Sequence, residues 1–217
     1  MRYDAVFFDL DGTLLDTLGD LSSAVNHVLE KRGFPTRTKE EIRSFIGDGF
    51  AMLIRRACPP YAEEKDLETA YDDFSEYYSA HIADTTLPYA GIALLVKRLS
   101  KEGVKMAVVS NKRDAAVKYL VDRFFGEHIK IALGERGGDT RKPSPLLCFE
   151  AAEKAGVLCE KTLYVGDSPS DITTARNAGM IPLAVTWGFR TKEELLKGGQ
   201  VLVAENAKQL EEIIFGR

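Results

Sequence analysis

Two aspartates near the beginning of the chain are the residues whose type and spacing most strongly suggest chemistry. Asp9 and Asp11 lie in the run Asp-Leu-Asp-Gly-Thr (9–13), directly after the apolar stretch Ala5–Phe8. The β-branched and aromatic residues of that stretch predict a short buried strand. Two carboxylates at the end of a buried strand are costly to desolvate unless a positive charge offsets them. A divalent cation is the simplest candidate for that charge.

Three further polar segments follow apolar stretches of the chain. They supply, in chain order, the pair Ser110-Asn111, then Lys142, and then the acids Asp167 and Asp171. In an open parallel sheet, ligands bind outside the carboxyl ends of the strands. Carboxylates around a cation suit Mg²⁺, which takes few protein ligands, and helix N-termini favour anions. Phosphoryl transfer needs this combination of groups.

The segments that must position these residues alternate between short apolar strands and helical patterns. The predicted strands are Ala5–Phe8, Val104–Val109, Ile129–Leu133, Thr162–Val165, Ile181–Val185 and, with a weaker pattern, Val201–Val203. The predicted helices between them are Gly91–Glu102, Asp114–Phe125, Pro145–Ala155 and Ser170–Ala178. Strand–helix–strand alternation implies parallel pairing with right-handed crossovers, and therefore an α/β core with helices on both faces of a parallel sheet.

One long stretch interrupts this alternation. About 90 residues without a convincing strand separate the first two predicted strands, which is too long for a plain connection. Helical patterns occur there at Leu21–Arg32, after the capping box of Thr38, at Phe50–Ala57 and at Glu63–Ala83. We therefore expect an inserted all-α domain over residues 18–84, with the core formed by residues 1–17 and 85–217. The hinges are predicted at Thr17–Leu21 and Asp84–Tyr89, which contain Gly19 and Pro88.

The four polar segments, taken in order, resemble the four motifs of the haloacid dehalogenase superfamily of aspartate-nucleophile phosphatases. The matching residues are DxDGT at Asp9–Thr13, Ser110 after an apolar strand, Lys142 before Pro143, and GDSxxD at Gly166–Asp171. The resemblance covers nearly the whole chain and implies a Rossmann-like core with the inserted helices as a cap. Among subfamilies, the chain is most similar to phosphoglycolate phosphatases and their pyrophosphatase and β-phosphoglucomutase relatives.

The resemblance also implies a role for each acid. Asp9 would be the nucleophile that takes the phosphoryl group as an aspartyl phosphate, and Asp11 the general acid and base. An acid at position 11 favours phosphoryl chemistry, since the metal-independent dehalogenases lack one there. A Mg²⁺ ion would be bound by Asp9, Asp167, Asp171 and the main-chain carbonyl of Asp11. Asp171 could instead be the acid of a capping box begun by Ser168, and the two roles can coexist.

The remaining candidates would bind the substrate. The resemblance implies this role for Gly12, Thr13, Ser110, Asn111 and Lys142, and it makes Ser110 and Lys142 catalytic as well, with Lys142 neutralising the nucleophile and the developing charge. In the cap, Gly47 lies in a loop between helices and could bring the main chain close to the substrate. Ser110 and Asn111 could alternatively cap the following helix, and Lys142 could be a solvated loop lysine. Arg43, Arg55 and Arg56 could clamp an anionic substrate, although such arginines on inserted helices are more often surface residues. The aromatic spacing of Tyr71–His81 favours core packing over a ligand pocket.

These residues lead to one preferred function and several alternatives. We predict a Mg²⁺-dependent phosphatase for a small phosphorylated metabolite, with 2-phosphoglycolate as the first candidate substrate. A β-phosphoglucomutase-like phosphomutase or a pyrophosphatase would use the same motifs. Phosphonate hydrolysis is disfavoured, because only Lys31 and Lys39 could supply a Schiff base from the cap. A binding module without turnover is disfavoured by the cost of keeping buried like charges.

Composition narrows the classes of partner and location. The chain has 217 residues, is 45% hydrophobic and carries a formal net charge of −4, without a basic block that could neutralise nucleic acid. No apolar run approaches the roughly 20 residues that span a bilayer. Three cysteines without a CxxC pair, and a strand beginning within the first few residues, lead us to expect a reduced cytoplasmic protein without a signal peptide. We expect a monomer or homodimer.

Overall fold

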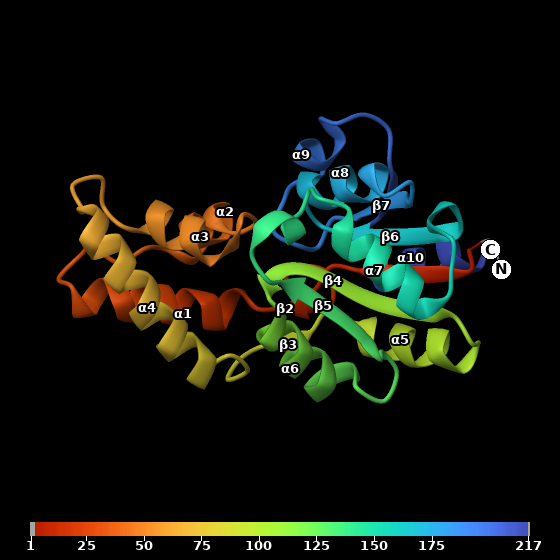
Figure 1. Ribbon diagram of the computed structural model, residues 1–217, viewed down its shortest axis with the longest axis horizontal. Helices are drawn as coiled ribbons and strands as arrows, with labels where there is room; N and C mark the ends of the chain where they lie inside the picture. The colour runs from red at the N-terminus through yellow and green to blue at the C-terminus, as the bar shows by residue number, and fades with distance from the viewer. Residues whose placement is uncertain (1–2, 217) are drawn as a thin grey trace. The chain divides into compact units, whose positions relative to one another are not determined.

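The computed structural model describes residues 3–216, and the chain divides into two compact units (Figure 1). One unit consists of Met1–Asp16 and Pro88–Arg217, and the other of Thr17–Leu87. The boundaries expected from the sequence lay at 17/18 and 84/85, so Thr17 and residues 85–87 fall in the helical unit here. Within the described residues, no helix is both long enough and apolar enough to cross a membrane.

The first unit is built on a six-stranded parallel sheet, which confirms the predicted α/β core. Its strands lie in the order β5-β4-β1-β6-β7-β8, so the strand order reverses at β1. β1 pairs on one side with β4 and on the other with β6, and Phe8 lies opposite Val108 and Val165. The strand bounds are β1 (Ala5–Phe8), β4 (Lys105–Arg113), β5 (Ile131–Glu135), β6 (Thr162–Gly166), β7 (Ile181–Val185) and β8 (Leu202–Ala204).

Helices cover both faces of this sheet. On one face, Phe7 and Tyr164 pack with residues of α7 (Leu146–Ala155) and α8 (Pro169–Asn177). Val6 and Phe8 alternate to the other side of the strand and are also fully buried, so a second layer must cover that face. That layer is formed by helices that contact one another, namely α5 (Ile92–Lys101), α6 (Asp114–Phe125) and α10 (Ala207–Phe215).

Several elements differ from the sequence-based expectation. β4 continues to Arg113, four residues beyond its predicted end at Val109. The short α9 (Lys192–Leu196) and α10 were not predicted, although Thr191 and Asn206 cap them with their side chains. Two 3-10 turns, η1 (Gly138–Thr140) and η2 (Cys159–Lys161), precede α7 and β6. The two-residue strands β2 (Leu15–Asp16) and β3 (Leu87–Pro88) form a separate small sheet.

The second unit contains four helices, as the sequence predicts. They are α1 (Leu18–Lys31), α2 (Lys39–Phe45), α3 (Gly49–Ala57) and α4 (Glu64–Ala80). The predicted capping box at Thr38 is present, with its side chain accepting from the Glu41 amide. Phe74 and Tyr78 of α4 are buried and pack edge-on against Phe50, so this aromatic face forms the core of the unit.

The two ends of the helical unit are joined by a buried carboxylate. Asp20, in the first turn of α1, accepts four hydrogen bonds from the main chains and hydroxyls of Thr85 and Thr86, at 2.5–2.9 Å. Burial of Asp20 raises the pKa of its carboxyl, but these hydrogen bonds outweigh that effect and lower it below its ordinary value. The first and last residues of the insertion are therefore held together by charge-assisted hydrogen bonds.

Candidate active site

The first aspartate continues the central strand into a tight loop. The amide of Asp9 donates to the Val165 carbonyl at 2.9 Å, which extends the ladder between β1 and β6 by one residue. The amides of Thr13, Leu14 and Leu15 all point to the Leu10 carbonyl, at 3.0–3.3 Å. This loop folds back on itself within one turn, so the side chains of residues 9–13 are fixed at the carboxyl edge of the sheet.

The same loop is held against Asp167, which follows β6. The Thr13 hydroxyl donates to Asp167 Oδ1 at 3.3 Å, and the Phe189 amide donates to Oδ2 at 2.7 Å. Gly12 has a φ of +84°, and a Cβ there would lie 2.3 Å from Asp167 Oδ2. A Cβ at Gly188 would lie 2.4 Å from the same oxygen. Glycine is required at both positions because the two loops close directly around this carboxylate.

Asp171 is the acid of the predicted capping box and also contacts Lys142, while its role as a metal ligand stays a prediction. It is the acid of the capping box of α8, in which its Oδ2 accepts from the amide and the hydroxyl of Ser168 at 3.0 and 2.6 Å. Its other oxygen, Oδ1, accepts from Lys142 Nζ at 2.5 Å. The helix cap therefore orients the carboxylate, and the carboxylate in turn holds the lysine.

Lys142 is a buried cation between two acids and is not a solvated loop lysine. Its Nζ lies 2.9 Å from Asp9 Oδ1 and 2.5 Å from Asp171 Oδ1, and the residue is 5% exposed. Burial lowers the pKa of Lys142, but the charges of Asp171 and Asp9 outweigh burial and raise it well above its ordinary value. The lysine is thus held in its charged form beside Asp9.

Asn111 contributes to the position of this lysine. Its side-chain oxygen accepts from the Lys142 amide at 2.6 Å. The sequence predicts phosphoryl binding or a helix cap for this residue, and the contact with the Lys142 main chain differs from both. Neither Ser110 nor Asn111 caps α6, because the N-cap position of that helix is Arg113. Ser110 itself is 2% exposed and lies within β4, two residues beyond Val108, the partner of the last residue of β1.

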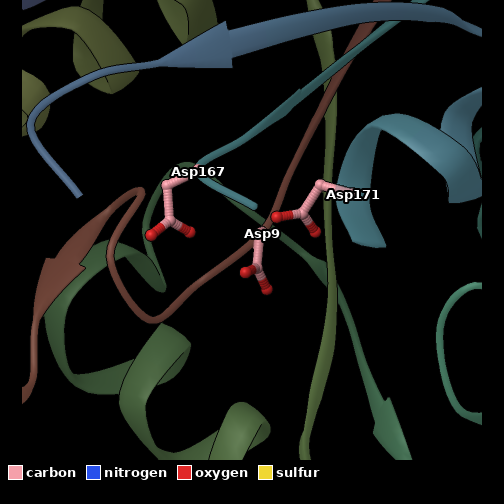
Figure 2. Close-up of side chains that lie close together, drawn as sticks. All are labelled: Asp9, Asp167 and Asp171. Carbon is pink, nitrogen blue, oxygen red and sulfur yellow. The ribbon is translucent and has the colours of Figure 1, made fainter. Parts of the chain in front are cut away.

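Three of the four predicted acids form one cluster. Asp9 follows β1, whereas Asp167 and Asp171 both belong to the segment after β6, and each acid offers an oxygen within 4.8 Å of the others (Figure 2). Burial and the neighbouring carboxylates together raise the pKa of Asp9 to about 6, against the opposing charge of Lys142, and the same two causes raise the pKa of Asp167 well above its ordinary value. Buried carboxylates that lack enough positive charge are the donor set of a hard divalent cation. The residues present therefore fit a Mg²⁺ site.

The fourth acid, Asp11, has a buried partner, Lys112, that the sequence pattern did not predict. Lys112 Nζ lies 3.0 Å from both carboxylate oxygens of Asp11, and its side chain is fully buried. Strand alternation could have revealed this lysine, because residues 110 and 112 point to the same face of an extended strand. It was overlooked because the strand was predicted to end at Val109.

The helical unit contains the predicted cap residue Gly47 and the candidate arginines Arg55 and Arg56. Gly47 lies between α2 and α3 with a φ of +129°, and its assignment as a substrate-binding residue stays a prediction. Arg55 pairs with Glu64 at 2.5 Å, and Arg56 pairs with Asp48 at 2.6 Å. Both arginines therefore have acidic partners in their own unit.

Comparison with known proteins gives the family. The model of the haloacid dehalogenase-like hydrolases matches residues 6–185. Phosphoglycolate phosphatase 1 of Pseudomonas aeruginosa is 35% identical over 94% of this chain and 77% of its own length. The phosphoglycolate phosphatase of Xanthomonas campestris pv. campestris is 32% identical over 89% of this chain and 88% of its own.

A solved structure agrees with these relatives. A candidate phosphoglycolate phosphatase from Lactobacillus delbrueckii subsp. bulgaricus is 37% identical, with a TM-score of 0.93 over the full length of both chains. The resemblance inferred from the four motifs is therefore confirmed. The chain belongs to the haloacid dehalogenase-like hydrolases.

Proposed function

We propose that the protein is a Mg²⁺-dependent phosphatase that hydrolyses a small phosphomonoester through an aspartyl phosphate, with 2-phosphoglycolate as the first candidate substrate. The observation that carries this proposal is the environment of Asp9. This buried carboxylate lies against Lys142 and beside the cluster that it forms with Asp167 and Asp171. Relatives named phosphoglycolate phosphatases, which align with most of this chain, support the choice of substrate.

The chain's own residues can carry out both half-reactions. In the first, an Asp9 carboxylate oxygen attacks phosphorus, the bond from phosphorus to the alcohol oxygen breaks, and protonated Asp11 donates its proton to that oxygen. In the second, a water oxygen attacks the phosphorus of the aspartyl phosphate while the Asp11 carboxylate takes one of its protons. The bond to Asp9 then breaks, phosphate leaves, and both aspartates return to their starting states.

Fixed charges supply the remaining stabilisation. Lys142 is held by Asp171 beside Asp9, so its positive charge lies where negative charge accumulates during attack. The Ser110 hydroxyl lies at the same edge of the sheet and would donate to a phosphoryl oxygen. A Mg²⁺ ion held by Asp9, Asp167 and Asp171 would add positive charge for the phosphoryl oxygens.

The test measures phosphate release from 2-phosphoglycolate and p-nitrophenyl phosphate, with Mg²⁺ and with EDTA. We expect turnover with Mg²⁺ and its loss with EDTA. Asp9→Asn should lower kcat by about 10³-fold or more, because it removes the nucleophile. The matched control is Asp4→Asn, which changes an exposed acid at the other end of the same strand and should retain wild-type activity.

Two further results would decide the mechanism. Acid-quenched wild-type protein should carry one added phosphoryl group by mass spectrometry, and Asp9→Asn should carry none. Wild-type protein that releases no phosphate from a panel of phosphorylated metabolites with any divalent metal would refute the proposed function. Activity that survives Asp9→Asn would refute the assigned nucleophile.

A further inference from the structure

Two lysines are buried among residues 3–216, and they serve different aspartates. Lys142 lies against Asp9 and Asp171, whereas Lys112 lies against Asp11. The first lysine belongs to a motif that the resemblance identifies. The second belongs to none of the motif positions, although its side chain is the more completely buried of the two, with 0% exposure against 3%.

The contact between Lys112 and Asp11 is a two-point contact. Nζ lies 3.0 Å from Oδ1 and 3.0 Å from Oδ2, so one ammonium group holds both carboxylate oxygens. Such a contact restricts both the rotamer and the tilt of a short side chain. The Asp11 side chain is 14% exposed. It therefore remains partly accessible to solvent while Lys112 holds it in place.

The main chain around Lys112 is itself fixed. Its amide donates to the Ser110 hydroxyl at 3.3 Å, and β4 extends through this residue beside β5, to which it pairs again at Arg113 after a register shift. The Lys112 side chain therefore extends from β4 to Asp11, in the loop that follows β1. A group mounted on a strand in this way holds its partner within a narrow range of positions.

We propose that Lys112 is a positioning residue that holds the Asp11 carboxyl group where it exchanges a proton with the leaving-group oxygen and with the attacking water. This inference rests on the proposed function, in which Asp11 is the general acid and base. Misplacement of a catalytic group by about 1 Å can cost roughly 10²-fold in rate. Loss of Lys112 should therefore act through proton transfer and leave nucleophilic attack by Asp9 largely intact.

The experiment uses the dependence on the leaving group to separate these steps. The parameter kcat/KM reports the steps up to alcohol release, and general acid catalysis contributes about 10²–10⁴-fold where the leaving oxygen needs a proton. For Lys112→Met we expect kcat/KM to fall by about 10²-fold or more with alkyl phosphates, and by less than about 10-fold with p-nitrophenyl phosphate, whose leaving anion is stable. The control is Lys118→Met, which removes an exposed lysine from α6 and should change neither value.

A double-mutant cycle distinguishes positioning from a general structural role. In the Asp11→Asn background, Lys112→Met should cause no further loss with alkyl phosphates, because the residue through which it acts is already gone. The double variant also leaves neither partner buried and unpaired, so it should fold even if Lys112→Met alone does not. Thermal unfolding of each variant verifies this.

The outcomes separate the inference from the function on which it rests. Equal losses with both types of ester, or a full additional loss in the Asp11→Asn background, would overturn the role of Lys112. Wild-type protein that hydrolyses neither ester would refute the proposed function itself. A selective loss with alkyl phosphates, absent in the Asp11→Asn background, is the result that we expect.

Discussion

Replacing Lys142 with methionine removes the positive charge that lies between Asp9 and Asp171. Its Nζ is 2.9 Å from the first carboxylate and 2.5 Å from the second, and the residue is 5% exposed. Breaking a buried pair by removing one partner costs about 3–5 kcal/mol, because the remaining charges stay buried without compensation. Methionine is of similar length, so little of this cost arises from a cavity.

The cost should depend on pH in a definite direction. Burial already raises the pKa of Asp9 from its ordinary value of 3.8 to about 6, with Lys142 opposing that rise. Without the lysine, the pKa of Asp9 rises further. Below its unfolded pKa the carboxyl is protonated in both states, and the variant loses little through this group. As the pH rises towards the folded pKa, only the unfolded chain ionises freely, so the stability of the variant falls.

The assay is urea unfolding in EDTA at about pH 5 and about pH 8, where this linkage predicts a small and a large difference from wild type. Lys118→Met is the matched control, because this lysine is 59% exposed and pairs with Asp114 within one helix. Such pairs contribute only about 0.3–0.5 kcal/mol. A deficit of Lys142→Met that is below about 1 kcal/mol at the higher pH, or independent of pH, would refute this reasoning.

Three other predictions concern the site and the insertion. Gly188→Ala should destabilise the folded protein by about 1–3 kcal/mol and abolish activity, because the added methyl group would lie 2.3 Å from Asp167 Cβ. The control is Gly198→Ala, where the nearest neighbour is the flexible tip of an arginine at 3.4 Å, and this variant should have the melting temperature of wild type. Asp20→Asn should destabilise by about 1.5–3 kcal/mol at neutral pH. Because hydrogen bonds lower the pKa of Asp20, that difference should shrink as the pH falls below the ordinary value of 3.8, and a constant difference in melting temperature would contradict it. Mg²⁺ should raise the melting temperature more at high pH than at low pH, since protons compete for the Asp9 carboxylate, and equal shifts would contradict this.

The elements that could be predicted from the sequence are those whose signals are local. β1 is found at its predicted bounds, since a continuous apolar run ends abruptly at Asp9. The end of β4 could not be predicted in this way. A lysine in a sequence normally indicates an exposed position. Lys112 is instead buried, and its charge is paired with Asp11, which lies 101 residues earlier in the chain. Only the tertiary fold reveals that partner, so the polar run after Val109 was interpreted as a loop.

The site was predictable to a similar extent. Parallel strands that end at one edge bring Asp9, Lys142 and Asp167 together, and motif order alone indicates that arrangement. The contact of Asn111 with the main chain of Lys142 depends instead on how two loops pack. The sequence pattern around each strand therefore indicates which residues lie at the edge of the sheet. The packing of the loops determines which of these residues contact and orient one another.

The charges of the site explain why the pKa values of Asp9 and Asp167 are raised. Four aspartates (Asp9, Asp11, Asp167 and Asp171) share two lysines, so the fully ionised site carries two uncompensated negative charges. The raised pKa values of Asp9 and Asp167 show how the protein alone would relieve this excess, namely by binding protons. A divalent cation would cancel the same two charges and leave Asp9 ionised for attack. Protons and a divalent cation therefore compete to neutralise the same excess negative charge. A proton bound to Asp9 removes its nucleophilic carboxylate, whereas a cation leaves that carboxylate ionised.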